Sequence, residues 1–283
     1  MPRRATPVLV ALLTLLAVLA PGGAASAAGP PADRATGWYL ALGDSLAAGY
    51  QPGQGDDLTG GYVGGVLDAV REEAPKTRLV NVACSGETVV TLVGGGRCAY
   101  EEGTQLAQAL EFLHAHGRFT RLVTIDIGAN DVQRCVSRDP LAIDHACVRQ
   151  GMADVQRLLP QVLAQLRQAA PGAQVVVANY YNPFLAASLT GPSGAALAQE
   201  SAVLQQALNG IIAGAAGSVG AEVADVATAF RSTDTTPVTV PGLGTVPTNV
   251  ATICGWTWMC LLTDIHANDT GYAVMAGTVA GRL

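Results

Sequence analysis

The sequence predicts an α/β domain built on a central parallel sheet of five strands. Five short apolar runs of strand length alternate with longer segments whose apolar residues recur at helical spacing. Strands that alternate with helices in this way form a parallel sheet with helices on both faces. A chain of 283 residues with 49% hydrophobic residues is long enough to bury such a core.

The expected elements follow one another along the whole chain. Strands are expected at 38–43, 78–84, 122–127, 174–178 and 221–226, and the main helices at 60–73, 104–116, 149–170, 194–216 and 270–279. The stretch from 231 to 263 is rich in Thr, Pro and Gly and has no helical period. We expect it to be a long functional loop.

The N-terminal residues have the three parts of a secretory signal peptide. Two arginines precede an apolar run over 8–20, and small residues follow at 25–27. We expect cleavage after Ala27, which divides the chain into a signal at 1–27 and a single domain at 28–283. No run reaches the roughly 20 apolar residues of a membrane-spanning helix. The mature protein is therefore expected to be secreted and to lack an integral membrane segment.

The charge of the chain limits its partners. The formal net charge is −6, and removal of the signal takes away two arginines and no acid. An acidic surface without clusters of Lys or Arg argues against nucleic acid and anionic membranes as partners. We expect a monomer that acts on a small molecule or a lipid.

The cysteines indicate disulfides, because their number is even and the chain is predicted to be exported. Zinc binding is disfavoured since no Cys-x-x-Cys pair occurs. Sequential pairing closes the shortest loops and puts each loop beside a candidate site residue, although other connectivities stay open. The pairs expected on this basis are Cys84 with Cys98, Cys135 with Cys147, and Cys254 with Cys260.

Candidate site residues lie just past the ends of the predicted strands. Ser45, Gly86 and Asn130 follow the first three strands, and His266 lies in the loop before the last helix. In open parallel sheets, ligands bind outside the carboxyl ends of the strands. A serine becomes a nucleophile when an imidazole accepts its proton. The backbone N–H groups of Ser45 and Gly86 and the amide of Asn130 are donors suited to a tetrahedral oxyanion, so the pattern predicts acyl transfer.

Four sequence blocks resemble those of the SGNH hydrolases, also called GDSL esterases and lipases. They are Gly43-Asp44-Ser45-Leu46, Gly86, Gly128-x-Asn130-Asp131 and the late His266. The resemblance implies a three-layer α/β/α flavodoxin-like fold and ester hydrolysis without a metal or cofactor. It also implies that Ser45 is the nucleophile, His266 the general base, and Gly86 and Asn130 oxyanion donors. The cysteine loops and export signal resemble the secreted actinobacterial (Streptomyces-type) lipases and esterases.

The group that orients His266 is the least determined part of the predicted site. The family often has an aspartate three residues before the histidine, but Thr263 occupies that position here and Asp264 follows it. Either a carboxylate or a backbone carbonyl can hold the Nδ1–H of the base. We expect a Ser45–His266 dyad oriented by a main-chain carbonyl near Thr263, with Asp264 secondary.

Other functions stay open at this point. A metal-dependent phosphoesterase would use carboxylates and the imidazole as ligands, and a non-catalytic lipid- or glycan-binding module would use the same fold. The sequence leaves the acyl chain and the alcohol undetermined, so a phospholipase or a carbohydrate acetylesterase is compatible with the site. The candidate metal ligands are Asp44, Asp126, Asp131, Asp264 and His266. An apolar acyl pocket is expected from Leu92, Val93, Phe184, Leu185, Trp256 and Trp258.

Overall fold

The computed structural model describes residues 1–2, 37–138 and 141–283. The predicted signal peptide and its cleavage site after Ala27 lie outside the described residues, apart from the first two. In the part of the chain that is described, no helix is both long enough and apolar enough to cross a membrane.

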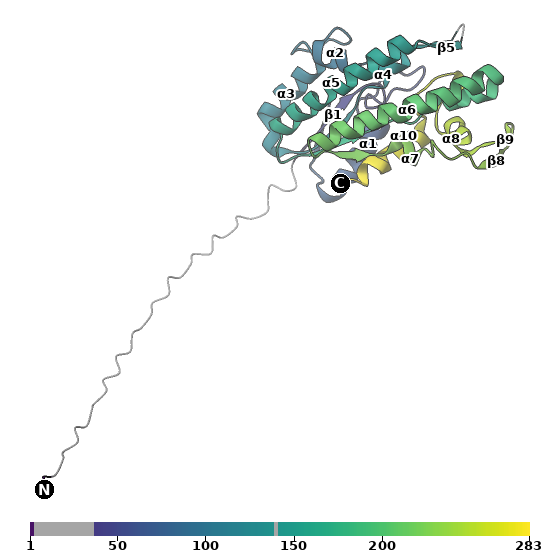
Figure 1. The fold of residues 1–283 in the computed structure, drawn as a ribbon. Coiled ribbons are helices and arrows are strands. Elements are labelled where there is room, and N and C mark those ends of the chain that lie inside the picture. Colours follow the sequence, from purple (N-terminus) through teal and green to yellow (C-terminus); the bar gives the residue numbers. More distant parts are fainter. Residues whose placement is uncertain (3–36, 139–140) are drawn as a thin grey trace. The chain divides into compact units, whose positions relative to one another are not determined.

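A parallel sheet of five strands lies at the centre of the domain (Figure 1). The spatial order is β2-β1-β3-β6-β7, which confirms the predicted sheet. The chain leaves β1 toward one edge and later returns to β3 on its other side, so the order reverses between these two strands. Ligands bind at such a switch point, outside the carboxyl ends of the strands. The strands are β1 (Trp38–Gly43), β2 (Arg78–Asn81), β3 (Thr120–Asp126), β6 (Gln174–Ala178) and β7 (Glu222–Ala224).

The apolar character of β1 follows from its central position. Its residues pair with both neighbours, and Leu40 lies opposite Val80 on one side and Val123 on the other. The side chains from Tyr39 to Leu42 are fully buried on both faces of the sheet. A strand covered on both faces reads as a continuous apolar run rather than an alternating one.

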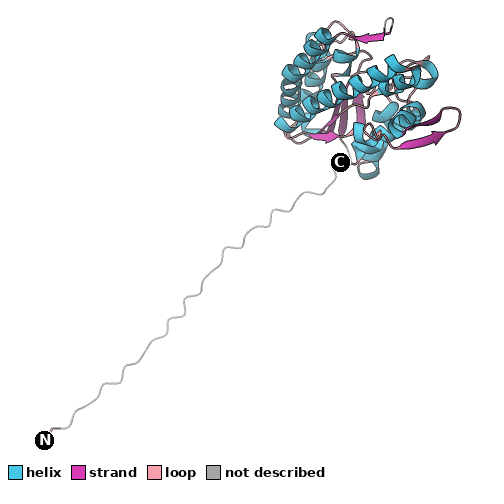
Figure 2. Ribbon diagram, turned by 45° about the vertical axis from the view of Figure 1, so that its right-hand side comes forward, coloured by secondary structure: helices cyan, strands magenta, loops and turns pink. Residues whose placement is uncertain are grey.

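Helices cover both faces of the sheet (Figure 2). On one face, α1 (Gly61–Glu73) packs against α10 (Asp269–Ala280). On the other, α5 (His145–Ala169) packs against α3 (Gln105–His116) and α6 (Pro192–Ser218). These are the five predicted helices, with ends that differ by a few residues. The result is the three-layer α/β/α arrangement that the sequence predicts.

The stretch from 231 to 263 differs from its prediction. It holds a two-stranded hairpin of β8 (Pro237–Val240) and β9 (Gly244–Pro247), followed by α8 (Thr248–Trp256) and α9 (Met259–Leu262). The prediction of a loop was wrong because these elements are short and their residues have low intrinsic helix propensity. Burial on the rest of the domain stabilises α8, whose Val250 and Ile253 enter the core.

Other short elements also escaped the sequence pattern, and most of them follow the carboxyl ends of strands. They are α2 (Val89–Gly94), η1 (Gly117–Phe119), α4 (Ala129–Gln133), β4 (Val136–Arg138), β5 (Leu141–Ile143), η2 (Pro183–Thr190) and α7 (Val226–Ala229). Three disulfides each close a short loop of the chain. They join Cys84 to Cys98, Cys135 to Cys147 and Cys254 to Cys260, as the sequential pairing predicts.

Candidate active site

Ser45 lies in the turn that directly follows β1, at the carboxyl edge of the sheet. The preceding Gly43 is held by the buried amide of Gln105, which accepts its N–H at 2.7 Å and donates to its carbonyl at 3.0 Å. Gly43 has a φ of 138°, and a Cβ there would collide with the main chain of Asp126. Only glycine therefore lets β1 and β3 approach this closely. Beyond the serine, the N–H of Tyr50 donates to the Ser45 carbonyl at 3.0 Å, which fixes the turn.

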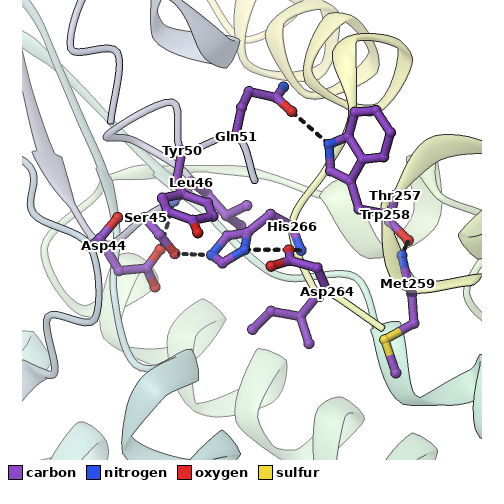
Figure 3. Close-up of polar contacts among 12 residues, drawn as sticks. Asp44, Ser45, Leu46, Tyr50, Gln51, Thr257, Trp258, Met259, Asp264 and His266 are labelled. Carbon is purple, nitrogen blue, oxygen red and sulfur yellow. Dashed lines mark hydrogen bonds and ion pairs between the residues drawn. The ribbon is translucent and has the colours of Figure 1, made fainter. Parts of the chain in front are cut away.

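The structure brings Ser45, His266 and Asp264 into one hydrogen-bonded chain (Figure 3). Ser45 Oγ lies 2.8 Å from His266 Nε2, and His266 Nδ1 lies 2.7 Å from Asp264 Oδ1. The Tyr50 ring packs against the imidazole, with 4.4 Å between the ring centroids. In this arrangement an imidazole can take the proton of a serine hydroxyl while a carboxylate holds its other nitrogen.

The expectation that a main-chain carbonyl near Thr263 orients His266 is wrong, because Nδ1 faces the Asp264 carboxylate. Thr263 ends α9 with a φ of 55°, which turns the chain back toward the sheet. Asp264 Oδ1 also accepts the backbone N–H of His266 at 3.0 Å. Such a bond from an aspartate to the backbone two residues on is an Asx turn. This local turn brings the carboxylate to the imidazole at a spacing of two residues instead of three.

The predicted oxyanion donors lie on neighbouring loops. Asn130 is in the first turn of α4, and its side-chain amide donates one hydrogen bond to the Glu87 carbonyl at 2.9 Å. The amide has two N–H groups, so the second remains for a ligand. Gly86 adjoins Glu87 and has a φ of 82°. Among the described residues, neither Ser45 nor Gly86 uses its N–H in a backbone hydrogen bond.

A small pocket of about 20 Å³ opens above the nucleophile. Ser45, Asn130 and His266 all line it, together with Gln133 of α4. Gly86 is not among its lining residues. The geometry therefore unites three of the four predicted residues at one cavity and places the loop of the fourth beside Asn130.

Two buried carboxyl groups lie behind Ser45. Asp44 Oδ2 accepts the hydroxyl of Tyr180 at 2.8 Å, and Asp126 Oδ1 accepts that of Tyr62 at 2.5 Å. Burial raises the pKa of Asp126 well above its usual range, and the neighbouring charge of Asp44 raises it further. Burial also raises the pKa of Asp44. Burial and the proximity of the two carboxyl groups therefore both disfavour a second negative charge beside the nucleophile.

The acidic residues that a metal-dependent alternative would need are engaged separately. Asp131 accepts the backbone N–H of Val89 at 2.9 Å, and burial raises its pKa to about 7. Asp264 binds His266, whereas Asp44 and Asp126 form the buried pair. Over residues 37–138 and 141–283, no three His, Cys, Asp or Glu side chains are grouped to hold a metal ion.

Sequence reasoning missed the contacts that hold the His266 loop. The backbone N–H of Trp258 donates to the His266 carbonyl at 3.0 Å, and its indole N–H donates to Gln51 at 2.6 Å (Figure 3). From the core side, the Tyr181 hydroxyl donates to the Ile265 carbonyl at 2.8 Å. No local sequence signal marks these partners, because they are more than 80 residues from the histidine loop or act through the backbone.

The parallel sheet between two helical layers is a three-layer, flavodoxin-like α/β/α fold, and the Ser–His–Asp arrangement lies at its carboxyl edge. Comparison with known families identifies the family to which this chain belongs. The model of the GDSL-like lipase/acylhydrolase family matches residues 41–274, and the chain belongs to this family. It is a carboxylic ester hydrolase, and the resemblance that the four sequence blocks predict is confirmed.

Solved structures of several related proteins resemble this one. The lipase Lip_vut3 from a goat rumen metagenome is 18% identical, with a TM-score of 0.57 over 86% of this chain and 96% of that chain. Phospholipase A1 from Streptomyces albidoflavus NA297 is 26% identical, with a TM-score of 0.46 over 69% of this chain and 81% of that chain. The extracellular lipase from Streptomyces rimosus is 27% identical, with a TM-score of 0.46 over 69% of this chain and 82% of that chain. A search of the curated proteins gave no match.

Proposed function

We propose that this chain is a secreted serine esterase that hydrolyses carboxylic esters through an acyl-enzyme on Ser45. The observation that carries the proposal is the continuous chain of hydrogen bonds from Ser45 through His266 to Asp264. A serine with an imidazole at 2.8 Å and a carboxylate behind the imidazole has the three roles that nucleophilic acyl transfer requires.

The first half of the reaction forms the acyl-enzyme. Ser45 Oγ attacks the ester carbonyl carbon while its proton passes to His266 Nε2. The resulting oxyanion accepts hydrogen bonds from the free amide N–H of Asn130 and the backbone N–H groups of Ser45 and Gly86. Nε2 then gives the proton to the departing alkoxide, and the alcohol leaves.

The second half repeats these steps with water as the nucleophile. His266 Nε2 accepts a proton from the water, which attacks the acyl carbon, and then returns the proton to Ser45 Oγ as the carboxylic acid leaves. Throughout both halves Asp264 holds the Nδ1–H of the ring, so that Nε2 keeps its lone pair toward the serine. Asp264 also stabilises the imidazolium that forms in each half.

The proposal is tested by intact-mass analysis after treatment with a serine-directed alkyl phosphonate, together with nitrophenyl acetate turnover. We expect one adduct on Ser45 in the wild type, and neither adduct nor turnover in Ser45→Ala. Ser85→Ala is the matched control, because Ser85 lies in the loop after β2 and binds Asp56 instead of His266. Turnover that survives Ser45→Ala and is abolished by EDTA would replace this mechanism with a metal-dependent one.

Export and the extent of the mature domain are part of the same proposal. Three disulfides support an oxidising compartment, and the sequence of residues 1–27 supports a cleaved leader. N-terminal sequencing of the protein recovered from the culture medium should begin at Ala28. Recovery of the full-length chain from the cytoplasm alone would contradict both points.

A further inference from the structure

We propose that the esterase takes substrates with a long, unbranched acyl chain, which lies in an apolar groove near the catalytic pocket. This inference rests on the proposed function and adds the substrate class to it. The groove has a volume of about 470 Å³, within the range of about 300–1,000 Å³ that proteins use to hold small ligands. Its lining includes Phe184, Ala187, Leu189, Leu197, Leu243 and Met259.

Shared lining residues place the groove near the catalytic pocket. Gln133 lines both the catalytic pocket and a second, smaller apolar pocket of about 30 Å³. Val136 and Phe184 line both this second pocket and the groove. The three cavities therefore lie next to one another, and this row of cavities is the path assigned to the acyl chain. Beyond Gln133 its walls are mostly apolar.

The start of the path at Gln133, on the helix of the oxyanion donor Asn130, favours the acyl chain over the alcohol as the occupant. The alcohol leaves on the imidazole side, because His266 Nε2 must protonate the departing oxygen. The acyl chain then extends from the carbonyl carbon away from the imidazole. Gln133 opens the path on α4, where it lies three residues from Asn130 and so on the same face of the helix. The helix that holds the oxyanion donor thus also guides the acyl chain.

The rim of the groove carries large apolar side chains exposed to solvent. Leu189 and Leu243 line the groove and are 43% and 37% exposed. Exposed apolar side chains that gather around a groove mark a site for an apolar ligand. This feature fits the hydrocarbon chain of a lipid.

Only part of the expected acyl pocket matches this groove. Of the six residues that the sequence suggests, Phe184 lines the groove. Leu92 and Leu185 are buried in the core instead. Trp256 packs edge-on against Phe230, with 5.3 Å between the ring centroids, and Trp258 holds the histidine loop. The tryptophans therefore support the site and do not wall the acyl chain.

The test is a series of nitrophenyl esters from acetate to dodecanoate, in which the alcohol is constant and only the acyl chain grows. Each methylene that enters the groove raises kcat/KM by at most about fourfold, the equivalent of burying one CH₂. We expect kcat/KM of the wild type to rise along the series. Ala187→Trp fills the groove, so it should lower dodecanoate hydrolysis about tenfold or more and leave acetate within about twofold.

A second variant and two matched controls separate groove effects from folding. Leu189→Lys puts a charge on the rim at an exposed position and should act in the same way. Ala115→Trp makes the same change as Ala187→Trp, and Phe119→Lys likewise replaces an exposed apolar side chain by lysine. Both positions are exposed and lie near the amino ends of the strands, so both variants should leave the whole series unchanged.

Three outcomes would overturn the proposal. The first is a rate that falls as the acyl chain grows in the wild type, and the second is an equal effect of Ala187→Trp on acetate and dodecanoate. The third is that the groove variants lower the rate for decyl acetate relative to ethyl acetate, two esters that differ only in the alcohol, and leave the acyl series unchanged. Acetate turnover that requires Ser45 would leave the proposed function intact in each case, so the two proposals fail separately.

Discussion

Replacement of Asp264 by asparagine tests the electrostatic part of the site. Asp264 Oδ1 accepts two hydrogen bonds, one from His266 Nδ1 at 2.7 Å and one from the His266 backbone N–H at 3.0 Å. In Asp264→Asn, a flipped amide would point its NH₂ group at both donors. The backbone N–H therefore holds the amide oxygen toward the ring, and the imidazole keeps its tautomer. The substitution removes the charge but preserves the orientation.

The magnitude follows from that distinction. A carboxylate and an imidazolium about 4 Å apart attract by about 4 kcal/mol at an effective dielectric constant of about 20. The side chains of Asp264 and His266 are 25% and 16% exposed, so solvent reduces this value. A loss of roughly 2–4 kcal/mol lowers kcat about 30- to 1,000-fold. Asp264→Ala also loses the orientation and should approach the roughly 10⁴-fold loss of a triad with the wrong tautomer.

The assay is kcat for nitrophenyl acetate in the wild type, Asp264→Asn and Asp264→Ala, with folding checked by circular dichroism. Asp68→Asn is the control, because Asp68 carries the same charge and is an exposed residue in the middle of α1. Equal losses in Asp264→Asn and Asp264→Ala would refute the argument that the backbone N–H fixes the amide. Losses below about threefold in both would remove Asp264 from the site altogether.

Three further predictions follow from the same structure. Asn130→Ala should lower kcat about 10²- to 10³-fold, the usual loss for one oxyanion donor, and a change confined to KM would show that Asn130 binds the ground state. Burial raises the pKa of Asp131 to about 7, whereas the pKa of an aspartate in the unfolded chain is about 4. As the pH rises from about 4 to 7, this carboxyl therefore lowers the free energy of unfolding by at most about 4 kcal/mol. Melting temperatures of Asp131→Asn and wild type should coincide at pH 4 and diverge in favour of the variant at pH 8; a constant difference would contradict this. Replacing Cys254 and Cys260 by Ala opens a loop with a separation of 6 residues and should cost roughly 2 kcal/mol of stability, against roughly 3 for the Cys135–Cys147 pair with its separation of 12. Activity should nevertheless fall more in the first variant, because that loop carries Trp258, and the opposite order would argue against its support of His266.

The sequence by itself determined the sheet, its helices and most of the candidate site. A strand buried on both faces must be apolar throughout, so β1 is visible as the run from Trp38 to Gly43. Long amphipathic helices such as α5 are visible for a similar reason, since one face must enter the core. The positions of Ser45, Gly86 and Asn130 on neighbouring loops were predictable because the carboxyl ends of parallel strands meet at one edge of the sheet.

Only the tertiary structure decided how the histidine loop is built and which cavities lie near Ser45 to form the proposed acyl path. Thr263 has a positive φ, which no sequence pattern predicts for a β-branched residue, and it turns Asp264 toward the imidazole. The proposed acyl path depends on η2, β4 and α9, which are only three to eight residues long. Segments this short have no hydrophobic periodicity that a sequence could reveal, so packing and disulfides set their positions. The proposed role of Gln133 and Phe184 follows only from the folded structure, in which these segments come together.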